Sequence, residues 1–196
     1  PVDANSLSAE QKSKAVRSLV NLKEKRTGEI KTRLLADGRC QRGQFTKQET
    51  TSPTVARESV IISAVIDAHE RRHVGTYDIP GAFLNANCDE NDDEVIMILK
   101  GRLAEMMAQV SPTLYRKYIT PDGRGTPVLY VKMEKAMYGL LKSALLFYRL
   151  LVGDLTGDGF VLNPYDPCVA NKTINGEQMT VIWHVDDLKV SHKDLA

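Results

Sequence analysis

Alternating apolar and polar residues near the end of the chain predict three consecutive β-strands. Residues 169–174 and 178–185 are rich in Val, Ile, Thr and Trp, which favour strands. Asn175-Gly176 lies between these two runs, and Asn-Gly favours the two positive φ angles of a type I′ turn. A third apolar run ends at Val190, so the pattern predicts a three-stranded meander with Asp186 and Asp187 at its second bend.

This pair of adjacent aspartates is the first candidate for chemistry. Two neighbouring carboxylates repel each other, and a shared divalent cation with a preference for oxygen ligands would offset that repulsion. Asp-Asp is also favourable turn chemistry in its own right. Both interpretations remain open at this point.

In the first seventy residues the spacing of apolar residues changes twice, from helical to alternating and back to helical. A Ser8–Gln11 capping box predicts a helix to about Leu19. Alternation then predicts a hairpin of strands 20–26 and 29–35. A second helix is expected over 53–70, with a core-facing stripe of five apolar residues: Val60, Ile61, Ala64, Val65 and Ala68.

The middle of the chain predicts a mixture of strands and helices. Strands are expected at 74–79, 94–99 and 128–133, a short helix at 101–110, and an amphipathic helix following Tyr138-Gly139 and fading near Gly153. The first of these strands ends at Asp78 and is followed by Pro80-Gly81, where a ligand could approach the backbone. The pattern therefore predicts an α+β protein.

Charge is distributed unevenly along the chain. The net charge is +1, but residues 1–57 carry +6 and residues 58–196 carry −5. This pattern is expected if the basic part binds along a polyanion and the acidic part binds metal ions. A solvated basic helix would give the same pattern. Lys31 and Arg33 are two residues apart and share one strand face, which suits a triphosphate or a merely soluble surface.

Several features exclude other classes of protein. The 196 residues, of which 42% are hydrophobic, suit one domain or two small lobes. No run of eighteen apolar residues or secretory signal is visible, and the missing initiator Met suggests a fragment or a processed piece. The three widely spaced cysteines indicate a reducing, intracellular compartment.

A second motif points to different chemistry. His69 to His73 reads His-Glu-x-x-His, the zinc-peptidase motif, in which two histidines one helical turn apart bind zinc. The strand expected from Val74 places His73 beyond the end of the helix. The sequence therefore favours helix-terminal cations over a zinc ligand pair.

Taken together, the blocks of this chain resemble the reverse transcriptase domain of copia-type LTR retrotransposons. They occur in the order of that family over most of the chain: Lys31-x-Arg33, Ser52-Pro53, Asp78-Ile79-Pro80-Gly81-Ala82-Phe83-Leu84-Asn85, Glu94-Val95-Ile96-Met97, Leu129-Tyr130-Val131-Lys132-Met133, Tyr138-Gly139-Leu140 and Val185-Asp186-Asp187.

The resemblance implies a right-hand polymerase with fingers and an antiparallel palm sheet packed on helices, without a thumb. Residues 1–72 would form a basic fingers-like lobe and 73–196 a palm-like lobe, with 100–135 returning to the fingers. The implied activity is RNA-directed DNA synthesis on an RNA template and DNA primer from dNTPs, with two Mg²⁺ or possible Mn²⁺ ions. It also implies a retrotransposon polyprotein with integrase and RNase H, located in a cytoplasmic particle or the nucleus.

The same resemblance assigns roles to individual residues. Asp78, Asp186 and Asp187 would be the catalytic metal ligands, with the Ile79 carbonyl as a further ligand. The expected nucleotide-binding residues are Lys31, Arg33, Gly81, Ala82, Phe83, Tyr138 and Gly139, and the expected primer contacts are His184 and Val185. Phe83 would be the gate against a 2′-hydroxyl; an ordinary core aromatic is the alternative.

The chain also departs from the family pattern. His184 stands where the family usually has Tyr, and residues 141–145 lack the common Lys-Gln-Ala-Pro run. These departures keep a second hypothesis open, a truncated or degenerate element product that binds nucleic acid without turnover.

Overall fold

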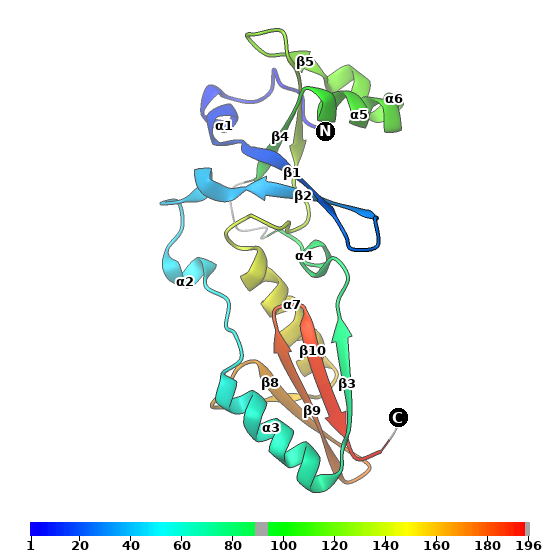
Figure 1. The fold of residues 1–196 in the computed structure, drawn as a ribbon. Coiled ribbons are helices and arrows are strands. Elements are labelled where there is room, and N and C mark those ends of the chain that lie inside the picture. The colour runs from blue at the N-terminus through cyan, green and yellow to red at the C-terminus, as the bar shows by residue number, and fades with distance from the viewer. Residues whose placement is uncertain (89–93, 195–196) are drawn as a thin grey trace. The chain divides into compact units, whose positions relative to one another are not determined.

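The computed structural model describes residues 1–88 and 94–194, which form two compact α+β units (Figure 1). The first unit comprises residues 1–49 and 87–143, and the second comprises 50–86 and 144–196. Each unit contains a five-stranded, mostly antiparallel sheet with helices. The boundary that the sequence suggests after residue 72 falls inside the second unit, between a helix and the strand that follows it.

The first unit is built on a sheet with strand order β2-β1-β4-β6-β5. β1 and β4 pair in parallel, and the other neighbours are antiparallel. The strands are β1 (Val16–Glu24), β2 (Ile30–Asp37), β4 (Ile96–Lys100), β5 (Thr120–Pro121) and β6 (Pro127–Lys132). The helical segments along this part of the chain are α1 (Ala9–Lys14), η1 (Gly38–Gln41), α2 (Lys47–Thr50), α5 (Arg102–Val110), α6 (Pro112–Tyr115) and η2 (Arg116–Tyr118).

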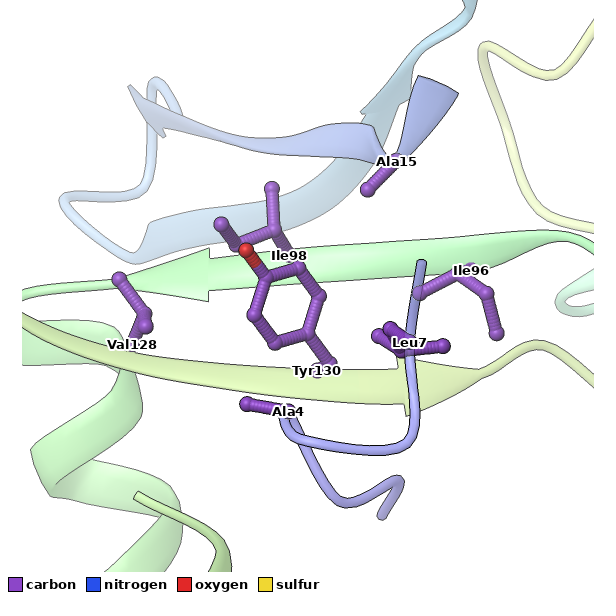
Figure 2. Packing of buried hydrophobic residues seen from close by; sticks show 7 residues of the cluster. All are labelled: Ala4, Leu7, Ala15, Ile96, Ile98, Val128 and Tyr130. Carbon is purple, nitrogen blue, oxygen red and sulfur yellow. The ribbon is translucent and has the colours of Figure 1, made fainter. Parts of the chain in front are cut away.

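Two apolar clusters hold the first unit together, one on each face of its sheet. Figure 2 shows the cluster in which Leu7 and Ala15 pack against Ile96, Ile98 and Tyr130 of the central strands. The other cluster is centred on Met97 and Leu129, and α5 contributes its fully buried Ala104 to it. Neighbouring residues of one strand thus enter opposite clusters, as expected for a strand covered on both faces.

The N-terminal helix is shorter than the sequence predicts. The Ser8–Gln11 capping box is present, with both reciprocal hydrogen bonds. The helix ends at Lys14, however, and residues from Val16 onward form β1, so the prediction of a helix to Leu19 is wrong. Pairing with β2 and β4 satisfies the backbone of β1 and outweighs the local helical periodicity.

The second unit is built on a fully antiparallel sheet with strand order β3-β10-β9-β8-β7. Its strands are β3 (His73–Asp78), β7 (Val161–Leu162), β8 (Val169–Ile174), β9 (Glu177–His184) and β10 (Asp187–His192), and its helices are α3 (Arg57–Glu70), α4 (Ala82–Asn85) and α7 (Ser143–Gly157). Asn175 and Gly176 join β8 to β9 with φ angles of 52° and 83°. The predicted type I′ turn and meander are therefore confirmed.

Helices α3 and α7 contact opposite faces of this sheet. Trp183 of β9 is buried against Tyr148 of α7, with ring centroids 6.3 Å apart. Lys189 of β10 is opposite Ile182, so its side chain lies on the other face, where it contacts Ser63 and Asp67 of α3. We call this second side, toward which Asp187, Lys189 and Ile182 point, the α3 face.

The apolar stripe predicted for α3 does not face the core. Ile61 and Val65 are each 64% exposed, whereas Ser63 and Asp67 are buried at 7% and 6%. On the buried side, Lys189 forms an ion pair with Asp67 and donates a hydrogen bond to Ser63 at 2.5 Å. Removing one partner would leave an uncompensated charge in a largely buried place, so this contact is costly to break once α3 lies on the sheet.

Asp166 holds the other end of α3. Its Oδ2 accepts a hydrogen bond from the backbone N–H of Ala56 at 2.9 Å, and its Oδ1 accepts one from Cys168 at 3.0 Å. Burial raises the pKa of Asp166, but hydrogen bonds from Ser59 and from these two N–H groups outweigh burial and leave the pKa below its usual value. The carboxylate is therefore charged where it meets the start of the helix.

The exposure of this apolar stripe leads to a testable expectation. Ile61→Glu should change the free energy of unfolding by less than about 0.5 kcal/mol, because surface substitutions away from buried groups have small effects. Val181→Glu, on the buried side of β9, is the matched control and should cost several times more, since Val181 is 3% exposed. Urea unfolding measures both; a loss for Ile61→Glu as large as that for Val181→Glu would contradict this placement of α3.

Two alternatives raised by the sequence can be compared with the fold. His69 lies in the last turn of α3, Arg71 ends the helix with φ of 55°, and His73 is the first residue of β3. The histidines are therefore not one turn apart on one helix, as the zinc-peptidase motif requires. Within residues 1–88 and 94–194, no helix combines the length and hydropathy needed to cross a membrane.

Candidate functional site

The turn between β9 and β10 carries the candidate carboxylates. Val185 and Asp186 are its two central residues, while Asp187 opens β10 opposite His184. The sequence predicts both aspartates in the turn, and the structure places Asp187 on the strand instead. Val185 has φ of 60°, and a positive φ at the first central residue alone is the pattern of a type II′ turn, where Gly is usual.

The third carboxylate arrives from a distant part of the sequence. Asp78 is the last residue of β3, and the antiparallel register places it directly opposite Asp187. The Ile79 N–H donates a hydrogen bond to the Asp186 carbonyl at 3.1 Å, which ties the end of β3 to the turn. Directly opposed residues have their Cβ atoms about 5 Å apart on the same sheet face. Asp78 and Asp187 are therefore neighbours on the α3 face.

Within residues 1–88 and 94–194, Asp78 and Asp187 have no ion-pair partner. Asp78 and Asp187 are both exposed, and like charges directly opposite each other destabilise a sheet. Lys189 lies two residues along β10 on the same face, but its ammonium is already paired with Asp67. A bound cation would offset the repulsion between these two carboxylates. The pair therefore has the charge expected of a cation-binding site.

A cavity of about 430 Å³ adjoins the pair within the second unit. Its polar lining includes Asp78, Asp187, His184 and the Lys189 cation, and Val60 and Ile182 are among its apolar lining residues. A cleft of this size with a few convergent polar groups is typical of a small-molecule binding site.

The donor set suits a hard divalent cation, because carboxylate oxygens are the ligands that Mg²⁺ and Mn²⁺ prefer. Across the described part of the chain, however, no group of three or more His, Cys, Asp or Glu side chains is arranged to hold a metal ion. The backbone thus brings Asp78, Asp186 and Asp187 together, while their side chains do not converge on one point.

Nucleophilic chemistry through cysteine is not supported in the second unit. Cys168 is fully buried, and burial raises the pKa of its thiol to about 11. A thiol is nucleophilic only as the thiolate, so Cys168 is inert at neutral pH.

The segment after Asp78 forms a turn and a short helix, and Phe83 packs against another aromatic side chain. Gly81 has φ of 62° and precedes the four-residue helix α4, which Ala82 begins. Ala82 is fully buried, and Phe83 is 9% exposed with its ring centroid 6.2 Å from that of Phe147 in α7. This packing is what the core-aromatic alternative predicts for Phe83.

The remaining predicted nucleotide-binding residues belong to the first unit. Lys31 and Arg33 lie two apart on β2, on one face as predicted, and Lys31 is directly opposite Lys23 of β1. Among the described residues these three cations have no ion-pair partner. The three cations are exposed and spread over two neighbouring strands, an arrangement that suits either a polyanionic ligand or a solvated surface.

Tyr138 and Gly139 lie in the first unit, where their backbone approaches the end of β2 closely. The Tyr138 carbonyl accepts a hydrogen bond from the Ala36 N–H at 2.8 Å, next to the end of β2. Gly139 has φ of 100°, and a Cβ built on it would lie 1.9 Å from the Ala36 carbonyl oxygen. The close approach of these two backbones therefore requires glycine.

The strain at the β9–β10 turn can be measured directly. Val185→Gly should raise the free energy of unfolding by roughly 0.5–1 kcal/mol, because relief of about 1–2 kcal/mol at a left-handed position exceeds the extra chain entropy lost by Gly. Val190→Gly, the same change in the extended part of β10, should instead lower stability by about 1 kcal/mol or more. Equal losses in both variants by urea unfolding would show that Val185 is not strained.

Sequence reasoning missed the charged residues beneath this site. Lys189 could have been noticed, because it follows Asp187 by two residues and so shares its strand face. Its partner Asp67 carries no comparable signal, since α3 and β10 are far apart in the sequence.

Comparison with known proteins adds nothing to these assignments: no family model, no curated protein and no solved structure matches this chain.

Proposed function

We propose that this chain is the catalytic core of an RNA-directed DNA polymerase that extends a DNA primer on an RNA template. The observation that carries the proposal is the direct opposition of Asp78 and Asp187 on adjacent strands, with Asp186 in the adjoining turn. This arrangement joins the two carboxylate blocks on which the resemblance to copia-type reverse transcriptases rests.

In this proposal the three aspartates would hold two Mg²⁺ or Mn²⁺ ions, with the Ile79 carbonyl as a further ligand. When bound, the ions would activate the primer 3′-hydroxyl and neutralise charge on the leaving pyrophosphate. Binding would require the Asp78, Asp186 and Asp187 side chains to turn toward a common point. Such a role fits phosphoryl transfer, which depends on positioning and charge more than on a protein nucleophile.

The other residues would position the substrates. Lys31 and Arg33 would hold the triphosphate, for which their shared strand face is suited. His184 and Val185 flank the carboxylates and would contact the primer end. Gly81 and Ala82 would place backbone beside the nucleotide, and Tyr138-Gly139 would support the end of the Lys31–Arg33 strand. Phe83 is left out of the proposed site because it is packed in the core.

Primer extension tests the proposal. Wild-type protein should extend oligo(dT) on poly(rA) with dTTP when Mg²⁺ or Mn²⁺ is present and should stop when EDTA is added. Asp186→Asn should lose this activity, because it replaces one negatively charged carboxylate of the proposed metal site with a neutral amide. Equal extension by the two proteins would contradict the assignment.

A second candidate function is a degenerate element product that binds nucleic acid without turnover. The observation that favours it is that, among the described residues, no three side chains of metal-binding type converge. Retention of a labelled RNA–DNA hybrid without extension under any metal condition would support this candidate. Binding should then weaken as salt increases, because phosphate contacts release counterions.

A further inference from the structure

A second cavity of about 330 Å³ lies within the second unit, on the α3 face but with different polar groups from those of the carboxylate site. Residues of α3, β8 and β9 line it, and Arg72 closes one side. Its volume falls at the lower end of the range for small-molecule sites. None of the three aspartates discussed above lines this cavity.

Arg72 is an unusual residue to find there. Its side chain is only 5% exposed, and buried arginines are normally fully paired. Its Nε donates to Glu70 at 2.8 Å and its Nη1 donates to Thr180 at 3.1 Å. Its Nη2 has no hydrogen-bond partner among the described residues, and it is not one of the completely enclosed polar atoms. The guanidinium therefore retains one donor group, and Arg72 is among the residues that line the cavity.

The neighbouring asparagine side chains also have N–H donors without a hydrogen-bond partner among the described residues. Asn171 accepts hydrogen bonds through Oδ1 from Gln178 at 3.0 Å and from Thr180 at 2.9 Å, so its Nδ2 donors remain available. Asn163 uses its Oδ1 to accept from the Tyr165 N–H at 2.8 Å, which likewise leaves Nδ2. At the polar end of the cavity the Oδ1 acceptors of Asn163 and Asn171 are engaged and their N–H donors remain. Gln178 also lines the cavity and donates through Nε2 to Asn171 and Thr180, which leaves its Oε1 as one acceptor beside these donors.

The rest of the lining is apolar. Its apolar lining residues are Ile62 and Ile66 of α3, Val169 of β8 and Ile182 of β9. Ile62 and Ile66 are 58% and 37% exposed. Arg72 is ion-paired with Glu70, which does not line the cavity, so what it offers a ligand is its remaining N–H donor rather than an unpaired charge. That donor, the asparagine amides and the apolar remainder match a ligand with one acceptor head and an apolar body. Arginine binds carboxylates well because its planar N–H groups fit the two oxygens.

We propose that this cavity binds a small monocarboxylic acid with a planar or aliphatic apolar body, with its carboxylate toward Arg72 and Asn171. The proposal does not depend on the polymerase assignment. It rests on the donor set and on the cavity, both of which lie within one unit.

Calorimetric titration of the full chain tests this site with two matched probes, 2-naphthylacetate and 2-(2-naphthyl)ethanol, which differ in head group. The acid should bind with one-to-one stoichiometry and at least about tenfold more tightly than the alcohol, because only the acid offers a charged acceptor. Ile62→Trp should fill the cavity and weaken binding of the acid at least tenfold. Ile61→Trp places the same side chain at a neighbouring position of α3 that does not line the cavity, and it should leave the affinity within about twofold.

Three results would overturn the proposal: no saturable binding of the acid, equal affinity for acid and alcohol, or unchanged binding by Ile62→Trp. Far-UV circular dichroism checks that each variant is folded. If Ile62→Trp does not fold, Asn171→Leu serves as the second variant. Asn171→Leu removes an amide donor from the polar end, so it should lower the affinity for the acid and leave the affinity for the alcohol unchanged. Equal losses of affinity for both probes would count against the site.

Discussion

Asp187→Asn is expected to reduce primer extension by at least about a thousandfold while slightly increasing the free energy of unfolding. The activity falls because the change removes a carboxylate that would hold metal beside Asp78, and losing such charge stabilisation costs orders of magnitude in rate. Stability rises by a few tenths of a kcal/mol because two like charges no longer oppose each other across β3 and β10. These opposite signs distinguish a functional carboxylate from a structural one.

Asp154→Asn is the matched control for this change. Asp154 is exposed on α7 in the same unit, so its substitution should leave both extension and unfolding nearly unchanged. Single-nucleotide extension rates and urea unfolding measure the two quantities for each protein. If Asp187→Asn destabilised the protein as it lost activity, Asp187 would be part of the structural framework and the metal-site proposal would lose its main support.

Gly139→Ala is expected to lower the free energy of unfolding by at least about 3 kcal/mol. Two costs combine: a left-handed φ of 100° that is strained for any residue with a Cβ, and a new atom 1.9 Å from the Ala36 carbonyl oxygen. The backbones of β2 and the Tyr138 loop would have to separate, which would also break the 2.8 Å hydrogen bond between them.

Gly43→Ala isolates the first of these costs. Gly43 has φ of 84°, but a Cβ there would meet no atom within 4 Å, so its substitution should cost only about 1–2 kcal/mol. Urea unfolding followed by circular dichroism compares the two variants. Equal losses would mean that the loop moves aside at little cost and that the close approach to Ala36 is not required.

The sequence by itself determined the features that depend on neighbouring residues. Asn175-Gly176 specified a type I′ turn, and β8 spans the predicted residues 169–174, because turn chemistry and alternation act over a few positions. The Ser8 capping box is also local and is present as predicted. The candidate aspartates were identified from their motifs alone, without any knowledge of their surroundings.

Only the tertiary structure decided which surfaces these elements bury and which distant residues meet. β1 starts at Val16 because β2 and β4 supply its hydrogen bonds. α3 buries Ser63 and Asp67 against the sheet, where Asp67 pairs with Lys189, more than a hundred residues away. Strand register likewise sets Asp78 opposite Asp187. The physical reason is common to all three: burial and pairing free energies depend on partners that are distant in sequence, and they exceed the local preferences of a single segment.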